Sequence, residues 1–262
     1  MTLTRINDIQ MAYTDTGAGN PVVLIHGYPF NRSLWNEQVA ALSSAYRVIT
    51  PDLRGFGETD PSEGPATMNL IAQDVAHLMD HLEIPQAVIG GLSMGGYVAL
   101  AFYKQFPSRV RALILADTRA QADTEEAKQT RFQQAEKALA EGMAAIADAM
   151  LPKLLTPETV SKHPEVVKRV RDMMLTLKPE GAAAALRGMA ERDDQTSLLP
   201  QISSPTLILV GADDAITTVA DSEKMHQAIK GSRLVVLENA GHVSNLEQTQ
   251  QFNQALLDFL RD

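Results

Sequence analysis

A serine flanked by glycines follows a short apolar run near residue 93, and this pattern constrains the fold more than any other in the chain. Residues 91–95 read Gly-Leu-Ser-Met-Gly, and residues 97–106 have the composition of a helix. This is the strand–turn–helix context in which a Gly-x-Ser-x-Gly motif exposes a serine hydroxyl on a sharp turn. The small residues on each side allow the strand and the helix to pass closely. We therefore expect Ser93 to be a nucleophile.

The length and composition suit one large α/β domain, or such a domain with an inserted lobe. The chain has 262 residues, of which 45% are hydrophobic and 21% charged, and its net charge is -9. This acidity argues against nucleic acid or an anionic membrane as a partner. The absence of cysteine excludes disulfides, thiolate metal sites and a cysteine nucleophile. Residues 1–8 lack an apolar signal segment and no run reaches membrane-spanning length, so we expect a cytoplasmic protein.

Short apolar runs alternate with helical patterns over much of the chain. A hairpin with its turn at Asn7-Asp8 is expected over residues 2–15, and further strands are expected at 22–25, 46–50, 87–89, 110–116, 206–210 and 234–237. Helices are expected at 33–42 with Ser33 as N-cap, from Thr67 as N-cap, and at 219–229 and 246–260. This alternation predicts an α/β fold with a mostly parallel sheet covered by helices on both faces.

The alternation stops between residues 118 and 200, where no strand-like run occurs. Residues 123–126 resemble a capping box that opens a helix ending near Glu141, and prolines at 157, 164 and 179 mark further helix starts. We expect about four short helices here, forming a nearly neutral insert after the sixth strand of a core made by residues 1–117 and 201–262. The methionines of the insert are expected to pack, although they could also line a pocket.

Three polar residues follow predicted strands in the order serine, aspartate, histidine. Ser93 follows the strand at 87–89, Asp214 follows the strand at 206–210, and His242 follows the strand at 234–237. Because carboxyl ends of parallel strands meet at one edge of a sheet, we expect the three to form a catalytic triad. Asp213 competes with Asp214 for the role of the acid, and Asp117 is a weaker competitor.

The other histidines have different expected roles. His26 precedes a turn and is expected to be a structural hydrogen-bonding residue. The four remaining histidines are explained as solvated side chains without a chemical role. Those four are His77, His81, His163 and His226. No pair of histidines has metal-ligand spacing with supporting carboxylates, so we expect no metal site. The backbone N–H groups of Tyr28 and Met94 are the expected oxyanion hole.

The chain resembles the α/β-hydrolase superfamily. The resemblance rests on His26-Gly27-Tyr28-Pro29, Asp52-x-Arg54-Gly55-x-Gly57, the motif around Ser93, Gly211-x-x-Asp214 and Gly241-His242. Residues 118–200 stand where the helical cap of that superfamily is inserted. Within it, the sequence looks most like bacterial carboxylesterases and 3-oxoadipate enol-lactonases. The resemblance implies a Ser93–His242–Asp214 triad, cofactor-free hydrolysis, and a substrate selected by the cap.

We therefore hypothesise that the chain is a serine hydrolase that cleaves small-molecule carboxylic esters through an acyl-enzyme. A lactone hydrolase such as an enol-lactonase is the nearest alternative, and it would need a basic contact for an anionic lactone. Candidates for that contact are Arg131, Arg169, Arg171 and Arg187, which lie in segments rich in acids. Carbon–carbon bond hydrolysis, peroxyacid formation and ligand sensing by a signalling protein remain open. Serine at 93 argues against dehalogenases and epoxide hydrolases of similar architecture, which carry aspartate there.

Overall fold

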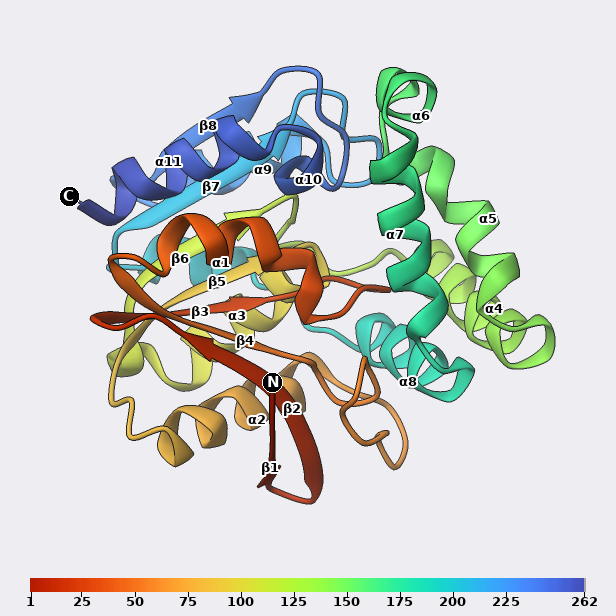
Figure 1. Cartoon of the computed structure of the whole chain (residues 1–262), viewed down its shortest axis with the longest axis horizontal. Helices are drawn as coiled ribbons and strands as arrows, with labels where there is room; N and C mark the ends of the chain where they lie inside the picture. The colour runs from red at the N-terminus through yellow and green to blue at the C-terminus, as the bar shows by residue number, and fades with distance from the viewer. Residues whose placement is uncertain (262) are drawn as a thin grey trace.

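Eight strands form a single sheet, and helices cover both of its faces (Figure 1). The structure, a computed structural model, describes residues 1–261. The strands are β1 (Thr2–Ile6), β2 (Ile9–Thr16), β3 (Asn20–Ile25), β4 (Tyr46–Pro51), β5 (Ala87–Leu92), β6 (Val110–Ala116), β7 (Thr206–Gly211) and β8 (Arg233–Leu237). Their order across the sheet is β1-β2-β4-β3-β5-β6-β7-β8. The predicted α/β fold with a mostly parallel sheet is therefore confirmed.

The helices differ widely in length, from four residues to seventeen. They are α1 (Asn36–Leu42), α2 (Met68–His81), α3 (Met94–Gln105), α4 (Glu125–Glu141), α5 (Met143–Leu154), α6 (Pro157–Lys162), α7 (Pro164–Thr176), α8 (Pro179–Ala190), α9 (Val219–Ala228), α10 (Ser244–Glu247) and α11 (Thr249–Arg261). Short 3-10 turns occupy Arg32–Trp35, Pro107–Arg109 and Thr196–Gln201. Across residues 1–261 no helix combines the length and the apolar character needed to span a membrane.

Only β2 runs in the direction opposite to the rest of the sheet. β1 pairs antiparallel with β2 around the predicted turn at Asn7-Asp8, and β2 pairs antiparallel with β4. The pairings from β4 to β8 are all parallel. The loops after β3 to β8 therefore lie along one edge of the sheet, which is where sites form in open parallel sheets.

The two faces of the sheet belong to two separate apolar clusters. In β3, Val22 and Leu24 join the cluster that contains Trp35 from the first 3-10 turn and Phe252 from α11. Val23 and Ile25 alternate with them and join the cluster formed with α2 and α3. Burial on both faces explains why the strands read as continuous apolar runs in the sequence.

Five helices, α4 to α8, stand between β6 and β7 and form the group at the right of Figure 1. Sequence analysis expected about four helices, including one that ends near Glu141, as α4 does; it missed α5, which follows Gly142. Their prolines at 157, 164 and 179 stand at helix starts as predicted. This group contacts the loops at the carboxyl edge of the sheet. Ala66 N–H donates to Ala184 O at 3.0 Å, and His242 N–H donates to Leu154 O at 2.9 Å.

Two helix starts differ from the prediction, while the N-cap at Thr67 is confirmed. Ser33 is not an N-cap, because the side chain of Asn31 accepts the Ser33 N–H at 2.9 Å and caps the preceding 3-10 turn. Thr124, rather than Asp123, caps α4 by accepting the Ala127 N–H at 3.2 Å. Asp123 is unavailable because arginine side chains surround its carboxylate.

The predicted C-terminal helix over 246–260 is two helices, α10 and α11. They are separated at Gln248, whose backbone leaves the helical region. The four-residue α10 begins directly after the His242 loop and leads into α11.

Candidate active site

Ser93 lies on a strained turn between β5 and α3. Its backbone has φ 56° and ψ -115°, a conformation that a non-glycine residue adopts only when the surroundings enforce it. A Cβ atom at Gly91 would lie 2.0 Å from the carbonyl oxygen of Gly95, and one at Gly95 would lie 2.1 Å from that of Ile25. Only glycine fits at both positions, so the two glycines of the motif allow the turn that lifts the Ser93 side chain.

The side chains of Ser93, His242 and Asp214 form a continuous chain of hydrogen bonds. His242 Nε2 lies 2.8 Å from Ser93 Oγ, and His242 Nδ1 lies 2.8 Å from Asp214 Oδ2. The three residues are 9%, 1% and 5% exposed in that order, so the chain is nearly closed to solvent. The structure thus brings together, from the ends of three strands, the residues that sequence analysis proposed as a triad. Such a chain can transfer the serine proton to the imidazole.

Asp214 is held as an anion by several donors besides His242. Its Oδ1 accepts the N–H groups of Ile216 at 2.8 Å and Thr217 at 3.0 Å, and its Oδ2 accepts the Thr217 hydroxyl at 2.8 Å. Burial alone would raise the pKa of Asp214, but the charge of His242 and these hydrogen bonds lower it. The competing Asp213 is exposed and contributes only a backbone N–H bond to Ala240. The arrangement favours Asp214 as the partner of His242.

Asp117 is a second buried carboxyl group in this region, but among residues 1–261 it forms no hydrogen bond with the imidazole. Its Oδ1 accepts the Gly211 N–H at 2.9 Å and its Oδ2 accepts the Ser244 hydroxyl at 2.6 Å. Burial and the charge of Asp214 raise the pKa of Asp117 well above its usual value. Asp117 therefore joins the loops after β6, β7 and β8, a role that sequence analysis missed.

His26 has the structural role that its position before a turn predicted. Its Nδ1–H donates to Gly27 O at 2.9 Å, and its Nε2 accepts the Leu53 N–H at 3.1 Å. Burial lowers the pKa of His26, so its imidazole is neutral and fits this pair of bonds. Both ring nitrogens are occupied by backbone groups of the loops after β3 and β4, which leaves His26 no part as a second base.

The loop after β3 passes directly beside Ser93. A Cβ atom at Gly27 would lie 3.2 Å from Ser93 Cβ, so Tyr28, the next residue, is adjacent to the serine. Met94 follows Ser93 as the first residue of α3, where a backbone N–H has no intrahelical acceptor. The Met94 N–H therefore has no acceptor within α3, and its pairing with the Tyr28 N–H as an oxyanion hole stays a prediction. The phenol of Tyr28 is also buried, and its hydroxyl has no hydrogen-bond partner among residues 1–261.

The four arginines considered for an anionic substrate fall into two groups. Arg171 and Arg187 pair with acids of the helical insert, at 2.9 and 2.7 Å, whereas Arg169 pairs with Glu37 of α1 at 2.8 Å. Arg131 differs, because its side chain is only 18% exposed and pairs with the buried carboxylate of Asp123.

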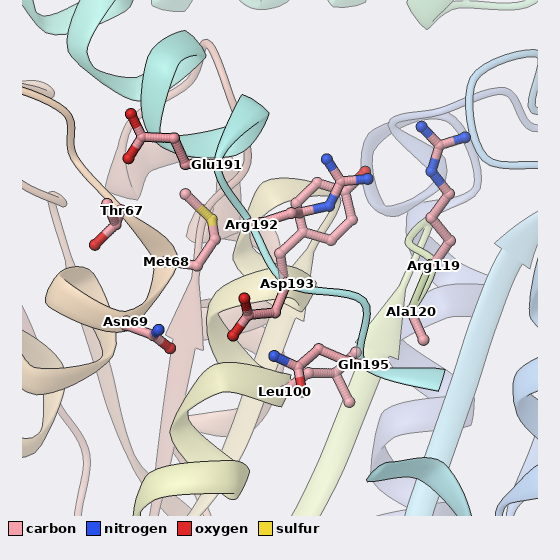
Figure 2. A pocket seen from close by; sticks show the side chains of 11 residues that line it. Thr67, Met68, Asn69, Leu100, Arg119, Ala120, Glu191, Arg192, Asp193 and Gln195 are labelled. Carbon is pink, nitrogen blue, oxygen red and sulfur yellow. The ribbon is translucent and has the colours of Figure 1, made fainter. Parts of the chain in front are cut away.

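Sequence analysis missed two further arginines that reach the same carboxylate. Arg119 Nη2 lies 3.2 Å from Asp123 Oδ1, and Arg192 Nη1 lies 2.7 Å from Asp123 Oδ2. The Arg192 guanidinium also covers the Tyr97 ring, 4.2 Å from its centroid. Figure 2 shows Arg119 and Arg192 among the residues that line one pocket, with their guanidinium groups at the same side of the view. Residue spacing alone gives no signal for this cluster, because 119, 123, 131 and 192 meet only in the folded chain.

The fold and the hydrogen-bonded serine, histidine and aspartate define a protein of the α/β hydrolase class. The chain matches the family described as alpha/beta hydrolase fold over residues 20–249, and it belongs to that family. A thermophilic esterase from Thermogutta terrifontis, solved with malate bound, is 46% identical, with a TM-score of 0.98 and coverage of 100% of this chain and 98% of that chain.

Two enol-lactonases are also similar over almost the whole chain. The enol-lactonase structure from Burkholderia xenovorans is 33% identical, with a TM-score of 0.94 and coverage of 100% of both chains. The 3-oxoadipate enol-lactonase 2 of Acinetobacter baylyi is 35% identical over 97% of this chain and 94% of its own length. The resemblance seen in the sequence motifs is therefore confirmed.

Proposed function

We propose that this protein is a serine hydrolase that cleaves carboxylic esters of small molecules through an acyl-enzyme. The observation that carries the proposal is the chain of two 2.8 Å hydrogen bonds from Ser93 through His242 to Asp214. It has the composition and geometry that activate a serine hydroxyl, because the base accepts the proton and the acid orients the base. The similarity to a thermophilic esterase supports the same reaction.

In the acylation step, Ser93 Oγ attacks the ester carbonyl carbon while His242 Nε2 accepts the hydroxyl proton. The backbone N–H groups of Tyr28 and Met94 stabilise the oxyanion of the tetrahedral intermediate. His242 then donates the proton to the leaving alkoxide, which departs as an alcohol. Asp214 holds Nδ1–H of the imidazole and stabilises the imidazolium that forms.

In the deacylation step, water replaces the alcohol. His242 accepts a proton from the water, which attacks the acyl carbon of the Ser93 ester. When the second tetrahedral intermediate collapses, the proton returns to Ser93 Oγ and the carboxylic acid product leaves. The net reaction consumes one ester and one water and forms one acid and one alcohol, without a redox step.

Residues 118–200 act in this proposal as a cap that selects the substrate. Helices from this segment contact the loops around His242 and Ala66, which border the carboxyl edge of the sheet. Hydrolysis of a lactone is the second candidate, since two relatives bear the name enol-lactonase. A lactone is a cyclic ester and would pass through the same steps, with the alcohol remaining attached to the acyl group.

The experiment compares the protein with its Ser93→Ala and His242→Ala variants on p-nitrophenyl butyrate at neutral pH. Loss of either group should lower kcat by about 10³-fold or more, because nucleophile and base act as a unit. Asp213→Asn, which alters an exposed carboxylate on the same loop as Asp214, is the matched control and should retain activity. Activity within a few-fold of the unmodified protein in Ser93→Ala would overturn the proposal.

A further inference from the structure

Glu247 joins the loop that carries His242 to the helical insert. Its Oε2 accepts the Gly241 N–H at 2.7 Å, and its Oε1 accepts the Thr156 N–H at 2.8 Å. Gly241 directly precedes His242, and Thr156 lies in the insert, where it is the N-cap of α6. One carboxylate therefore bridges the backbone next to the proposed base and the backbone of a segment far away in the sequence.

A direct backbone contact joins the same two segments. The His242 N–H donates to the carbonyl oxygen of Leu154, the last residue of α5, at 2.9 Å. In Figure 1, the helix α10, which carries Glu247, stands at the side of the core that faces the insert. The insert therefore holds the backbone of His242 both directly and through Glu247.

Gly241 shows how closely these parts fit together. A Cβ atom at this position would lie 3.0 Å from Glu247 Oε2, 3.0 Å from Leu154 O and 3.3 Å from Thr156 N. These separations are shorter than ordinary van der Waals contacts, so a side chain here would push the insert or Glu247 away. The glycine before His242 thus allows the insert to approach the loop.

The core holds the same histidine from the other side. The imidazole bonds to Ser93 and Asp214 at 2.8 Å each, while the backbone of His242 bonds to the insert. The ring keeps both of its bonds only if the loop stays in place. A misplacement of about 1 Å at a reacting group can lower a rate by about 10²-fold, so the contacts that fix this loop bear on catalysis.

We propose that Glu247 is a positioning residue that keeps His242 in its working orientation by clamping the His242 loop to the helical insert. The insert then supports the chemical step as well as the choice of substrate. Because the clamp acts on the base, the rate should depend on it for every ester, whichever part of the insert a substrate touches. This inference rests on the proposed hydrolysis at Ser93 and adds a residue to its machinery.

The first test measures kcat and KM of Glu247→Gln on p-nitrophenyl acetate and p-nitrophenyl hexanoate at neutral pH. Glutamine has the same length but one acceptor oxygen, so its NH₂ group must face one of the two backbone N–H groups. We expect kcat to fall about 10-fold on both esters with KM nearly unchanged. Glu238→Gln, which alters an exposed carboxylate between β8 and His242, is the matched control and should retain kcat.

The second test approaches the clamp from the insert. Thr156→Pro removes the N–H that Glu247 accepts, and the backbone suits proline because residue 156 has φ -67° and residue 155 is extended. Thr156→Ala keeps this N–H but loses the same hydroxyl, which accepts the Thr159 N–H and caps α6. Thr156→Pro should lower kcat by about 10-fold, as Glu247→Gln does, whereas Thr156→Ala should stay close to the unmodified protein.

Melting temperatures separate positioning of the base from stabilisation of the fold. If Glu247 only stabilises the fold, Glu247→Gln will melt at a lower temperature but keep its kcat wherever it stays folded, and this result would overturn the inference. A change confined to KM on the hexanoate, or equal kcat in Thr156→Pro and Thr156→Ala, would also overturn it. Failure of the unmodified protein to hydrolyse either ester would instead overturn the proposed function, so the two failures are distinguishable.

Discussion

The hydroxyl of Ser244 donates a 2.6 Å hydrogen bond to the carboxylate of Asp117, and this bond joins the loop after β6 to the helix that follows His242. The other oxygen of Asp117 accepts the Gly211 N–H at the end of β7. One buried side chain therefore links the loops that carry His242 and Asp214. Asp117 itself has φ 44°, a left-handed conformation that its neighbours must enforce.

Asp117→Asn should change the pH dependence of stability. Because burial and the charge of Asp214 raise the pKa of Asp117, the folded protein binds a proton that the unfolded chain has already lost. Asp117 therefore contributes stability below its unfolded pKa, near 3.8, and that contribution is lost as pH rises through the raised folded value. The variant has no carboxyl group at this position and therefore lacks this loss. Urea unfolding at several pH values should show that the free energy of unfolding of the variant, relative to that of the unmodified protein, increases as pH rises. For the control Asp213→Asn, the difference in free energy of unfolding from the unmodified protein should not increase with pH.

Thr217→Val should weaken the proposed catalysis without affecting substrate binding. The Thr217 hydroxyl donates to Asp214 Oδ2 at 2.8 Å in a buried site, and valine has nearly the same shape without a donor. Loss of one bond to a carboxylate should lower kcat by about 10-fold, with KM nearly unchanged because Thr217 acts through Asp214. Thr217→Ser keeps the hydroxyl and should restore most of kcat. An equal loss in the serine variant would show that packing, rather than the hydrogen bond, matters at this position.

Gly91→Ala should destabilise the fold strongly. An added Cβ would lie 2.0 Å from Gly95 O, so the strand and the helix could not keep their present distance. We expect a loss of about 3 kcal/mol or more in the free energy of unfolding, measured with urea. Gly64→Ala is the control, because Gly64 has positive φ, unlike Gly91, but no atom lies within 4 Å of an added Cβ. That substitution should cost only about 1 kcal/mol.

The ion pair between Arg54 and Asp74 should be far more sensitive to substitution than an exposed pair. Arg54 Nε and Nη2 donate to the Asp74 carboxylate at 2.6 and 2.8 Å, and both side chains are almost completely buried. Asp74→Asn leaves the buried guanidinium with only the exposed carboxylate of Asp8, at 3.1 Å, and should cost about 3 kcal/mol of stability. The same change at Asp15, which pairs with Arg47 at the surface, should cost less than about 1 kcal/mol. Similar losses in the two variants would contradict this account of the Arg54 motif.

Sequence patterns predicted the sheet because parallel strands leave a strong local signal. Buried runs such as 110–116 are apolar on both faces, and the structure places β6 at Val110–Ala116. The glycines at 91 and 95 were also informative, since close backbone approach tolerates no side chain there. Helix starts were less predictable, because Ser33 and Asn31 are both good N-caps and only local packing decides between them.

The long-range polar contacts could not be predicted from the sequence. Asp123 lies in a sequence typical of an N-cap, but its carboxylate pairs with Arg119, Arg131 and the distant Arg192. Asp117 follows a strand just as an acid of the triad would, and only the folded structure shows that its partners are Gly211 and Ser244. Such contacts depend on side chains that converge from several loops, which single-sequence patterns do not record.

The most direct test of the account is covalent trapping of the nucleophile. Diethyl p-nitrophenyl phosphate, which phosphorylates activated serines, is incubated with the protein, and the adduct is located by intact-mass and peptide mass spectrometry. The account predicts one diethylphosphoryl group per chain, attached to Ser93, with esterase activity lost in proportion to labelling and no adduct in Ser93→Ala. Stoichiometric labelling at another residue, or full esterase activity in a protein completely labelled at Ser93, would contradict it.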